Sequence, residues 1–169
     1  MNEKHIEESK LIITRIFDAP RDLVFKMWTD SEHLKHWWGP KGLTMHIAKL
    51  DLRSDGVFHY SMKSPDGQEM WGKFVYREIS VPDKLVFINS FSDEEGNTVR
   101  APFSPTWPLE IQNTLMFSEE EGKTKLIMQG TPVSATEEKH KTFQAAHDGV
   151  KQGFTGTLDQ LADYIKQVK

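Results

Sequence analysis

The sequence predicts an α+β domain in which a curved antiparallel sheet of about seven strands wraps around a long C-terminal helix. From about residue 43 to residue 131, apolar and polar residues alternate at a spacing of two, and turn signals separate the runs. After residue 134 the apolar residues recur every three or four positions, as in an amphipathic helix. The 169 residues are 37% apolar and 27% charged, which suits one soluble domain spanning residues 1–169.

The chain is predicted to begin with a strand and two short helices. Leu11–Phe17 is apolar and β-branched, which favours a strand. Arg21–Thr29 places its apolar residues on one helical face. Thr29 and Glu32 have the spacing of a capping box, which predicts that a second helix continues through residues 34–38.

Six strands joined by short turns follow, and together they predict an antiparallel meander. We expect these strands at residues 43–52, 57–62, 69–79, 84–91, 109–117 and 123–129.

The last part of the chain predicts one long helix of about 50 Å. Ser134 and Glu137 have capping-box spacing at its start. Three glycines, Gly149, Gly153 and Gly156, interrupt the pattern at four- and three-residue spacing. Close packing of the helix on the sheet is the interpretation we favour, and a bend in the helix is the alternative.

The composition excludes several function classes. There is no cysteine, which excludes disulfides, thiol nucleophiles, zinc ribbons and iron–sulfur ligation. The 21 basic and 25 acidic residues leave a net charge of −4, with no field that would attract nucleic acid. No apolar run reaches the ~18 residues of a membrane span, and residues 1–10 lack the apolar core of a signal peptide. We expect a cytoplasmic protein with a loosely ordered segment at residues 1–10 and neither nucleic-acid nor membrane partners.

The run FDAPRDLVFKMWTDSEHLKHWWGPKGLT at residues 17–44 resembles the N-terminal segment of one known family. This is the activator of heat-shock-protein-90 ATPase homologue-like family. It belongs to the START-like (SRPBCC) superfamily, with polyketide cyclases and the birch-pollen allergen fold. Further stretches resembling the family are Asp51-Leu52-Arg53 with Gly56 and Phe58, residues 72–79 with Pro82 and residues 84–87, and Gly153-Phe154 with Leu158 and Leu161.

The resemblance covers residues 11–165 and implies the helix-grip fold, with a cavity between sheet and helix for an apolar or amphipathic small molecule. Strand alternation independently assigns an inward row of residues, in which Leu52 and Met70 are also expected to point inward. The ligand-binding candidates are Phe58, Tyr60, Met62, Phe74, Tyr76, Phe87, Asn89, Phe91, Asn113 and Leu115 on the strands, and His147, Val150 and Phe154 on the helix.

Four of these candidates, Tyr60, Tyr76, Asn89 and Asn113, are polar residues in otherwise apolar rows. A buried hydroxyl or amide without a partner costs about 1–3 kcal/mol, so each needs another side chain, a water or a ligand. A few polar groups that converge in an apolar cavity are typical of a small-molecule site. We therefore predict a hydrophobic or aromatic ligand of lipid, polyketide or flavonoid type. A core filled by side chains is the alternative.

Two segments outside the strands are expected to form the rim of this cavity. Residues 92–108 make a loop of 17 residues that carries Phe103 and Trp107. Loops this long often act as lids, but a proline-rich loop also shields a sheet edge from pairing, and both interpretations stay open. Trp37 and Trp38 form the other part of the predicted rim.

No catalytic motif is present, so we assign no catalytic residue, no metal and no cofactor. His33 and His36 lie three apart on a helix without an obvious third ligand, which favours a surface role. His147 is the best general-base candidate, although we favour a rim histidine bound to water. Asp51 and Arg53 predict a structural ion pair rather than a catalytic dyad.

Three functions therefore remain open. The first is a small-molecule-binding domain without assigned catalysis. The second is a polyketide cyclase- or isomerase-like enzyme that uses His147, Tyr60 or Tyr76 as acid or base. The third is a stress-related chaperone co-factor that acts through an exposed patch at Trp37 and Trp38.

Overall fold

The computed structural model describes residues 10–39 and 42–168, so the expectation for the N-terminal segment lies outside the described residues apart from Lys10. Within them, the predicted order of strands and helices is confirmed. The elements are β1 (Leu11–Phe17), α2 (Arg21–Thr29), α3 (Ser31–Trp37), β2 (Thr44–Leu50), β3 (Val57–Lys63), β4 (Glu69–Ser80), β5 (Lys84–Ser92), β6 (Thr98–Val99), β7 (Ile111–Glu120), β8 (Lys123–Pro132), α4 (Glu137–Ala145) and α5 (His147–Val168).

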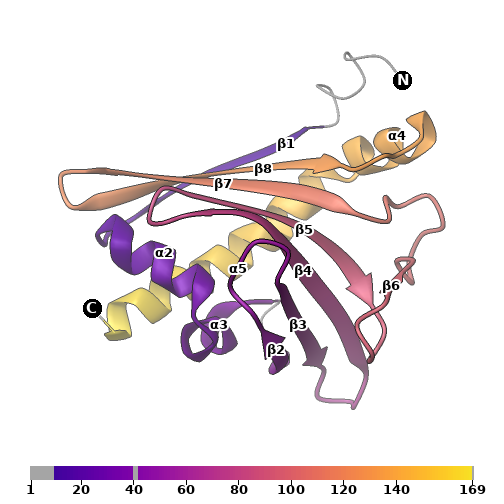
Figure 1. Ribbon diagram of the computed structural model, residues 1–169, viewed down its shortest axis with the longest axis horizontal. Helices are drawn as coiled ribbons and strands as arrows, with labels where there is room; N and C mark the ends of the chain where they lie inside the picture. Colours follow the sequence, from indigo (N-terminus) through magenta and orange to yellow (C-terminus); the bar gives the residue numbers. More distant parts are fainter. Residues whose placement is uncertain (1–9, 40–41, 169) are drawn as a thin grey trace.

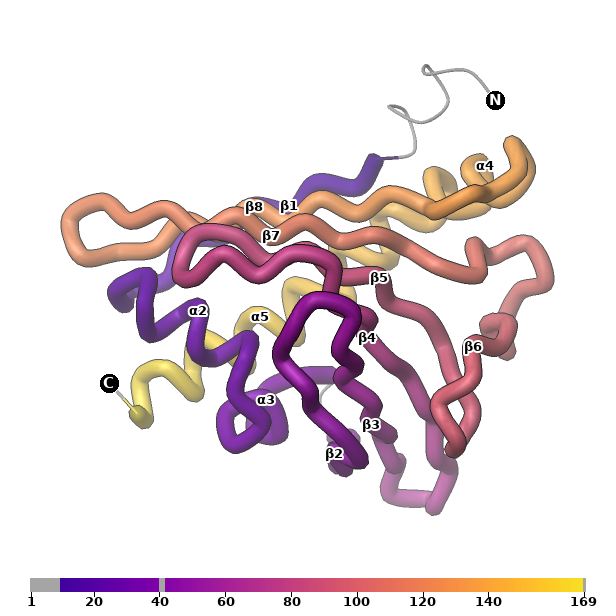
Figure 2. Tube along the Cα trace, viewed as in Figure 1, coloured from indigo at the N-terminus to yellow at the C-terminus, as the bar shows by residue number. Residues whose placement is uncertain are grey.

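The strands form one antiparallel sheet in the order β1-β8-β7-β5-β4-β3-β2, and the short β6, which the sequence did not predict, pairs with β5. From β2 to β5, and again from β7 to β8, consecutive strands are neighbours because each short turn returns the chain beside the strand that precedes it. β1 instead pairs with β8 at the edge opposite to β2. Figure 1 shows α5 running along one face of the strongly bent sheet. The loop that contains β6 lies at the opposite end of the molecule from α2 and α3 (Figure 2).

The core is concentrated at the end where α2 and α3 lie. Trp28 and Trp37 are 0% and 1% exposed there. The buried residues of α5 all lie from its midpoint onward: Thr157, Leu158, Leu161 and Ile165. In the N-terminal half of α5, Val150 and Phe154 are only half-buried. The helix is therefore packed firmly at one end and more loosely at the other.

The predicted cap of α3 is wrong by one residue. The Asp30 carboxylate, rather than the Thr29 hydroxyl, accepts the backbone N–H of Glu32 at 2.9 Å. Thr29 is not free to cap, because its hydroxyl donates to the carbonyl of Phe25 in the preceding helix at 3.0 Å.

The long C-terminal helix is also interrupted. It consists of α4 and α5, which meet at Ala146, where one backbone N–H is shared among three carbonyls of the last turn of α4. Thr136 caps α4 by accepting the backbone N–H of Lys139 at 3.2 Å, whereas the predicted cap, Ser134, has a φ of 47° and lies before the helix.

Two residues expected on the inward row are exposed. Leu52 is 38% exposed because β2 ends at Leu50, after a register shift between Ile47 and Lys49. Met70 is 42% exposed near the start of β4, yet it shares a hollow with the inward residues Tyr60 and Met62, as its strand position predicts.

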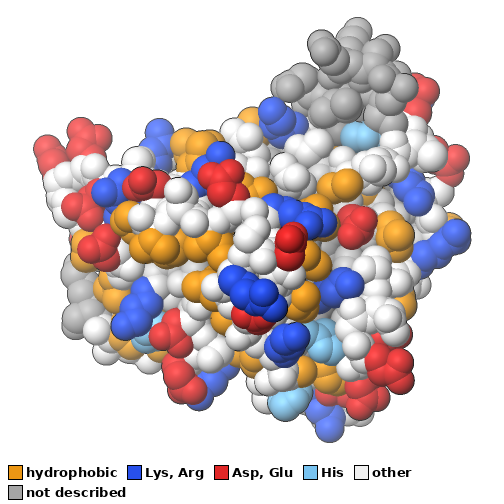
Figure 3. Space-filling model, in the orientation of Figure 1, with side chains coloured by type: hydrophobic (Ala, Val, Ile, Leu, Met, Phe, Trp, Pro, Cys, Tyr) orange, Lys and Arg blue, Asp and Glu red, His pale blue; other side chains and the backbone are white. Residues whose placement is uncertain are grey.

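The surface mixes charges of both signs. In the view of Figure 3, Lys and Arg side chains alternate with Asp and Glu, and apolar side chains lie between them. In the described part of the chain, none of the helices combines the length and apolar character needed to cross a bilayer.

The favoured interpretation of the helical glycines is wrong. A Cβ atom placed at Gly149, Gly153 or Gly156 would meet no atom within 4 Å, so none of the three permits a close approach. The close approach occurs in the sheet instead. A Cβ atom at Gly72 on β4 would lie 2.8 Å from the hydroxyl oxygen of Tyr60.

The open space around Gly156 and the close contact at Gly72 predict opposite effects of a glycine-to-alanine substitution on stability. Gly156→Ala should raise the free energy of unfolding by up to ~1 kcal/mol, because alanine restricts the unfolded chain and favours the helix. Gly72→Ala should lower it by about 1–3 kcal/mol, because the Tyr60 ring must move within a packed core. Urea unfolding of both variants measures the two signs, and a destabilised Gly156→Ala would contradict the open space seen at this position.

Candidate ligand cavity

Three neighbouring hollows lie beside the sheet, and Phe91 lines all three. Two of them also contact the N-terminal half of α5, through Val150 and Phe154. The sheet hollow, about 260 Å³, includes Tyr60, Gly72 and Trp107 in its wall. The central hollow, about 180 Å³, lies between Asn113 on β7 and Phe154 on α5, among other residues. The helix hollow, about 400 Å³, is bounded by Trp38 and Phe154 among others. They occupy the end of the molecule where α5 is loosely packed.

The structure brings most of the strand and helix candidates to these hollows. Eight of them contribute to the walls: Tyr60, Met62, Phe87, Asn89, Phe91, Asn113, Val150 and Phe154. Four others, Phe58, Phe74, Tyr76 and Leu115, are fully buried in the core instead. His147 lines none of the three hollows; it is half-buried, and its ring lies 5.3 Å from that of Phe143.

The two adjacent tryptophans have different roles. Trp37 does not lie at the rim, since its ring packs edge-on against Trp28 at 4.7 Å and its indole N–H donates to the carbonyl of Met27 at 3.1 Å. The predicted exposed patch at Trp37 and Trp38 is therefore wrong. Trp38 follows the last residue of α3 in an extended conformation. Its ring lines the central and helix hollows and lies 6.1 Å from Phe154.

The turn after Trp38 is anchored to α5. The Gly39 carbonyl accepts hydrogen bonds from Gln160 Nε2 at 2.7 Å and from Thr157 Oγ1 at 3.3 Å. Gly39 has a φ of 97°, and a Cβ atom there would lie 2.5 Å from the sulfur of Met62. Only glycine fits this buried left-handed position without strain. These contacts hold Trp38 over the hollows.

The long loop both covers a sheet edge and contributes to the cavity wall. β7 pairs with β5 only as far as Asn89, and β6 pairs with β5 beyond that point, at Phe91 and Ser92. Phe103 and Trp107 line the central hollow, with ring centres 5.3 Å apart. The loop thus combines features of both interpretations that the sequence left open.

Sequence reasoning missed several wall residues. Leu11 and Thr157 line the central and helix hollows respectively, and Gly39 lines the helix hollow. The alternation of β1 could have identified Leu11, since its side chain shares a face with Phe17. Nothing in the local sequence brings Gly39 and Thr157 together, because α3 and α5 meet only in the folded chain.

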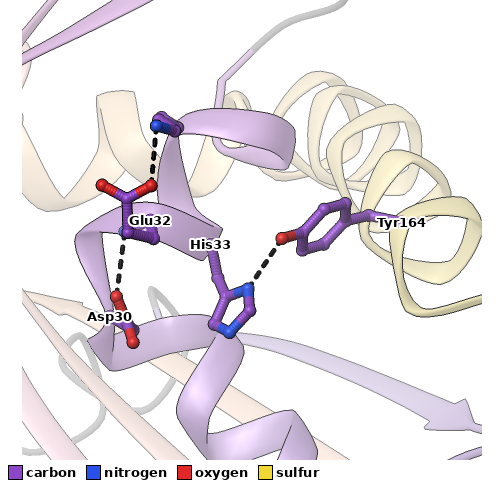
Figure 4. A network of polar contacts seen from close by, with 5 residues as sticks. Asp30, Glu32, His33 and Tyr164 are labelled. Atoms are coloured by element: carbon purple, nitrogen blue, oxygen red, sulfur yellow. Dashed lines mark hydrogen bonds and ion pairs between the residues drawn. The ribbon is translucent and has the colours of Figure 1, made fainter. Parts of the chain in front are cut away.

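The other candidate polar residues have structural partners. Figure 4 shows His33 pointing from α3 to the Tyr164 hydroxyl of α5, with His33 Nδ1 and Tyr164 Oη 2.7 Å apart. His36 stacks on the same tyrosine ring at 4.9 Å. The Asp51–Arg53 ion pair is confirmed, at 2.7 Å. The described residues contain no cluster of three or more His, Cys, Asp or Glu that could hold a metal ion.

The hollows are electrically neutral. Among the described residues that line them, none is Asp, Glu, Lys, Arg or His. Burial raises the pKa of Tyr60 to about 12, so this phenol stays protonated at neutral pH. Tyr76, behind the cavity wall, also has a raised pKa because of burial, and its hydroxyl is buried without a hydrogen-bond partner.

Comparisons with known proteins agree with this architecture. Residues 18–166 match the family described as Activator of Hsp90 ATPase homolog 1-like protein. No curated protein matches the chain. The chain is similar to the crystal structure of protein Ms6760 from Mycobacterium smegmatis, with a TM-score of 0.78 and 25% identity over 97% of this chain and 95% of that one.

Two solution structures are equally similar. A protein from Arthrobacter aurescens gives a TM-score of 0.79 at 25% identity, over 96% of this chain and 88% of that one. A protein from Staphylococcus epidermidis gives 0.76 at 25% identity, over 95% and 92% respectively. These matches confirm the helix-grip architecture.

The buried phenol of Tyr60 predicts a pH dependence of stability. Between about pH 10 and pH 12 the unfolded chain releases this proton while the folded chain keeps it. The free energy of unfolding should therefore fall as the pH rises, by up to about 1.4 kcal/mol per pH unit from this group. Tyr60→Phe should flatten the fall in urea-unfolding curves measured from pH 9 to pH 12. Parallel pH curves for wild type and variant would show that Tyr60 ionises equally in both states.

Proposed function

Because the chain belongs to the Activator of Hsp90 ATPase homolog 1-like family, we propose that it is a ligand-binding domain whose hollows take a hydrophobic or aromatic small molecule. The observation that carries this proposal is the loose packing of α5. Val150 and Phe154 belong to the apolar stripe of the helix, yet both line hollows and stay half-buried. An apolar ligand would remove their surface from water, which stabilises by about 25 cal/mol per Å².

The walls also have the composition of a small-molecule site. Aromatic rings from strands, helix and loop surround the hollows, notably Trp38, Phe91, Trp107 and Phe154, and the polar groups among them are few. Rings of this size offer a large apolar contact area at little loss of conformational entropy. A flat, mainly apolar molecule is the ligand class that they suit best.

The two alternatives have less support. A cyclase-like reaction needs a base that reaches the ligand, but His147 does not line the hollows, and Tyr60, held in its neutral form, could act only as an acid. The chaperone alternative relied on an exposed tryptophan pair, and Trp37 is buried. For the compartment, the cytoplasm remains our prediction from the composition.

A substitution that fills the cavity tests the proposal. Val150→Trp should place an indole in the central and helix hollows and weaken binding of the neutral fluorescent probe N-phenyl-1-naphthylamine at least tenfold, about 1.4 kcal/mol. Gln152→Trp is the matched control, because Gln152 is exposed on the same helix and lines no hollow. Fluorescence titration measures both dissociation constants, and unfolding curves verify that both variants fold.

Saturable binding by the wild type and by Gln152→Trp, with loss in Val150→Trp, is the expected result. Two results would argue against the cavity. One is failure of the wild type to bind this probe or any of a set of flavonoids, sterols and fatty-acid esters. The other is undiminished binding in a folded Val150→Trp.

A further inference from the structure

Two amide side chains lie next to each other on the inner face of the sheet, among apolar residues. Asn89 lies on β5 and Asn113 on β7, and Asn113 Nδ2 donates to Asn89 Oδ1 at 2.8 Å. Both line the central hollow, and Asn89 also lines the sheet hollow. The pair is therefore placed where two of the three hollows adjoin.

The hydrogen bonds determine which atom each amide presents to the cavity. The Ile111 carbonyl can only accept, and the atom of Asn113 that lies 3.4 Å from it must be the nitrogen. Both protons of Asn113 Nδ2 are then used, one by Ile111 and one by Asn89 Oδ1. Asn89 Nδ2 consequently faces away from Asn113, and no described residue accepts a hydrogen bond from it.

The surroundings of this free donor are apolar and uncharged. An ionised group moved into such surroundings without an opposite charge is strongly disfavoured, whereas a neutral oxygen that accepts a hydrogen bond is tolerated. A water molecule could also accept from Asn89 Nδ2. The apolar lining, however, offers such a water few of the two to four partners that hold buried waters in place.

Building on the proposed function, we infer that the cavity selects an uncharged aromatic ligand with a carbonyl oxygen, and that Asn89 Nδ2 donates the hydrogen bond that orients it. The carbonyl oxygen lies at the junction of the sheet and central hollows, and the ring system extends between Phe91 and Phe154. Asn113 is a positioning residue, because it holds Asn89 with the nitrogen toward the cavity.

Three probes of nearly equal shape test this inference on the full chain. 2-Acetylnaphthalene carries the carbonyl, 2-isopropenylnaphthalene replaces its oxygen with a CH₂ group, and 2-naphthoate carries a charge. Nuclear magnetic resonance titration of ¹⁵N-labelled protein measures each dissociation constant. We expect the ketone to bind about tenfold more tightly than the alkene, because only the ketone can accept a hydrogen bond from Asn89 Nδ2. We expect naphthoate to bind at least a hundredfold more weakly than the ketone at neutral pH.

The side-chain NH₂ signals of Asn89 give a direct readout in the wild type. They are identified by their absence from Asn89→Leu, and they should shift with the ketone but not with the alkene. In Asn89→Leu the ketone should bind only as tightly as the alkene. Gln112→Leu is the matched control, since it removes an exposed amide from the opposite face of β7 and should leave the tenfold preference intact.

If Asn89→Leu does not fold, Asn89→Ala serves in its place, because it also removes the donor and adds no bulk to the cavity wall. Equal affinities of ketone and alkene in the wild type would overturn the inference while leaving the proposed function standing. Preference for naphthoate would likewise overturn it. Failure of all three naphthalenes to shift any inward-facing signal would overturn both.

Discussion

The arrangement of the whole molecule depends on where α5 is held against the sheet. Its C-terminal half is packed against the core through Leu158, Leu161 and Ile165, while α2 and α3 supply Trp28 and Trp37 at the same end. At the other end no side chain of α5 is fully buried. Because a bent sheet and a straight helix cannot touch along their whole length, firm packing at one end leaves space at the other.

Polar contacts reinforce this one-sided attachment. Gln160 and Thr157 bind the carbonyl of Gly39, and Tyr164 meets His33 and His36 of α3. All of these contacts lie between the midpoint of α5 and its C-terminal end. They fix the turn that carries Trp38, so the same contacts that hold the helix also place an aromatic wall over the hollows.

The neutrality of the cavity follows from the same packing. Charged side chains remain on the outside, where water solvates them, and the inward faces of the strands bury aromatic and aliphatic groups. The amides of Asn89 and Asn113 are exceptions that satisfy each other in part. The donor that Asn89 has left over would give the otherwise apolar cavity a fixed hydrogen-bonding direction, and that direction would make the site selective.

The sequence by itself determined the elements, their order and most of the inward rows. Apolar residues recur every two positions in a half-buried strand and every three to four in a half-buried helix, so their spacing reflects both the backbone geometry and the buried face. It also identified Asn89, Asn113 and Trp38 as unusual. Only the tertiary structure decided which inward residues became core and which became wall. Phe74 and Phe91 both occupy inward strand positions, yet Phe74 is fully buried and Phe91 lines three hollows. Phe74 packs against Phe87 and Trp38, whereas Phe91 contacts Phe103 of the long loop. Contacts between separate elements such as these are not determined by the local sequence pattern.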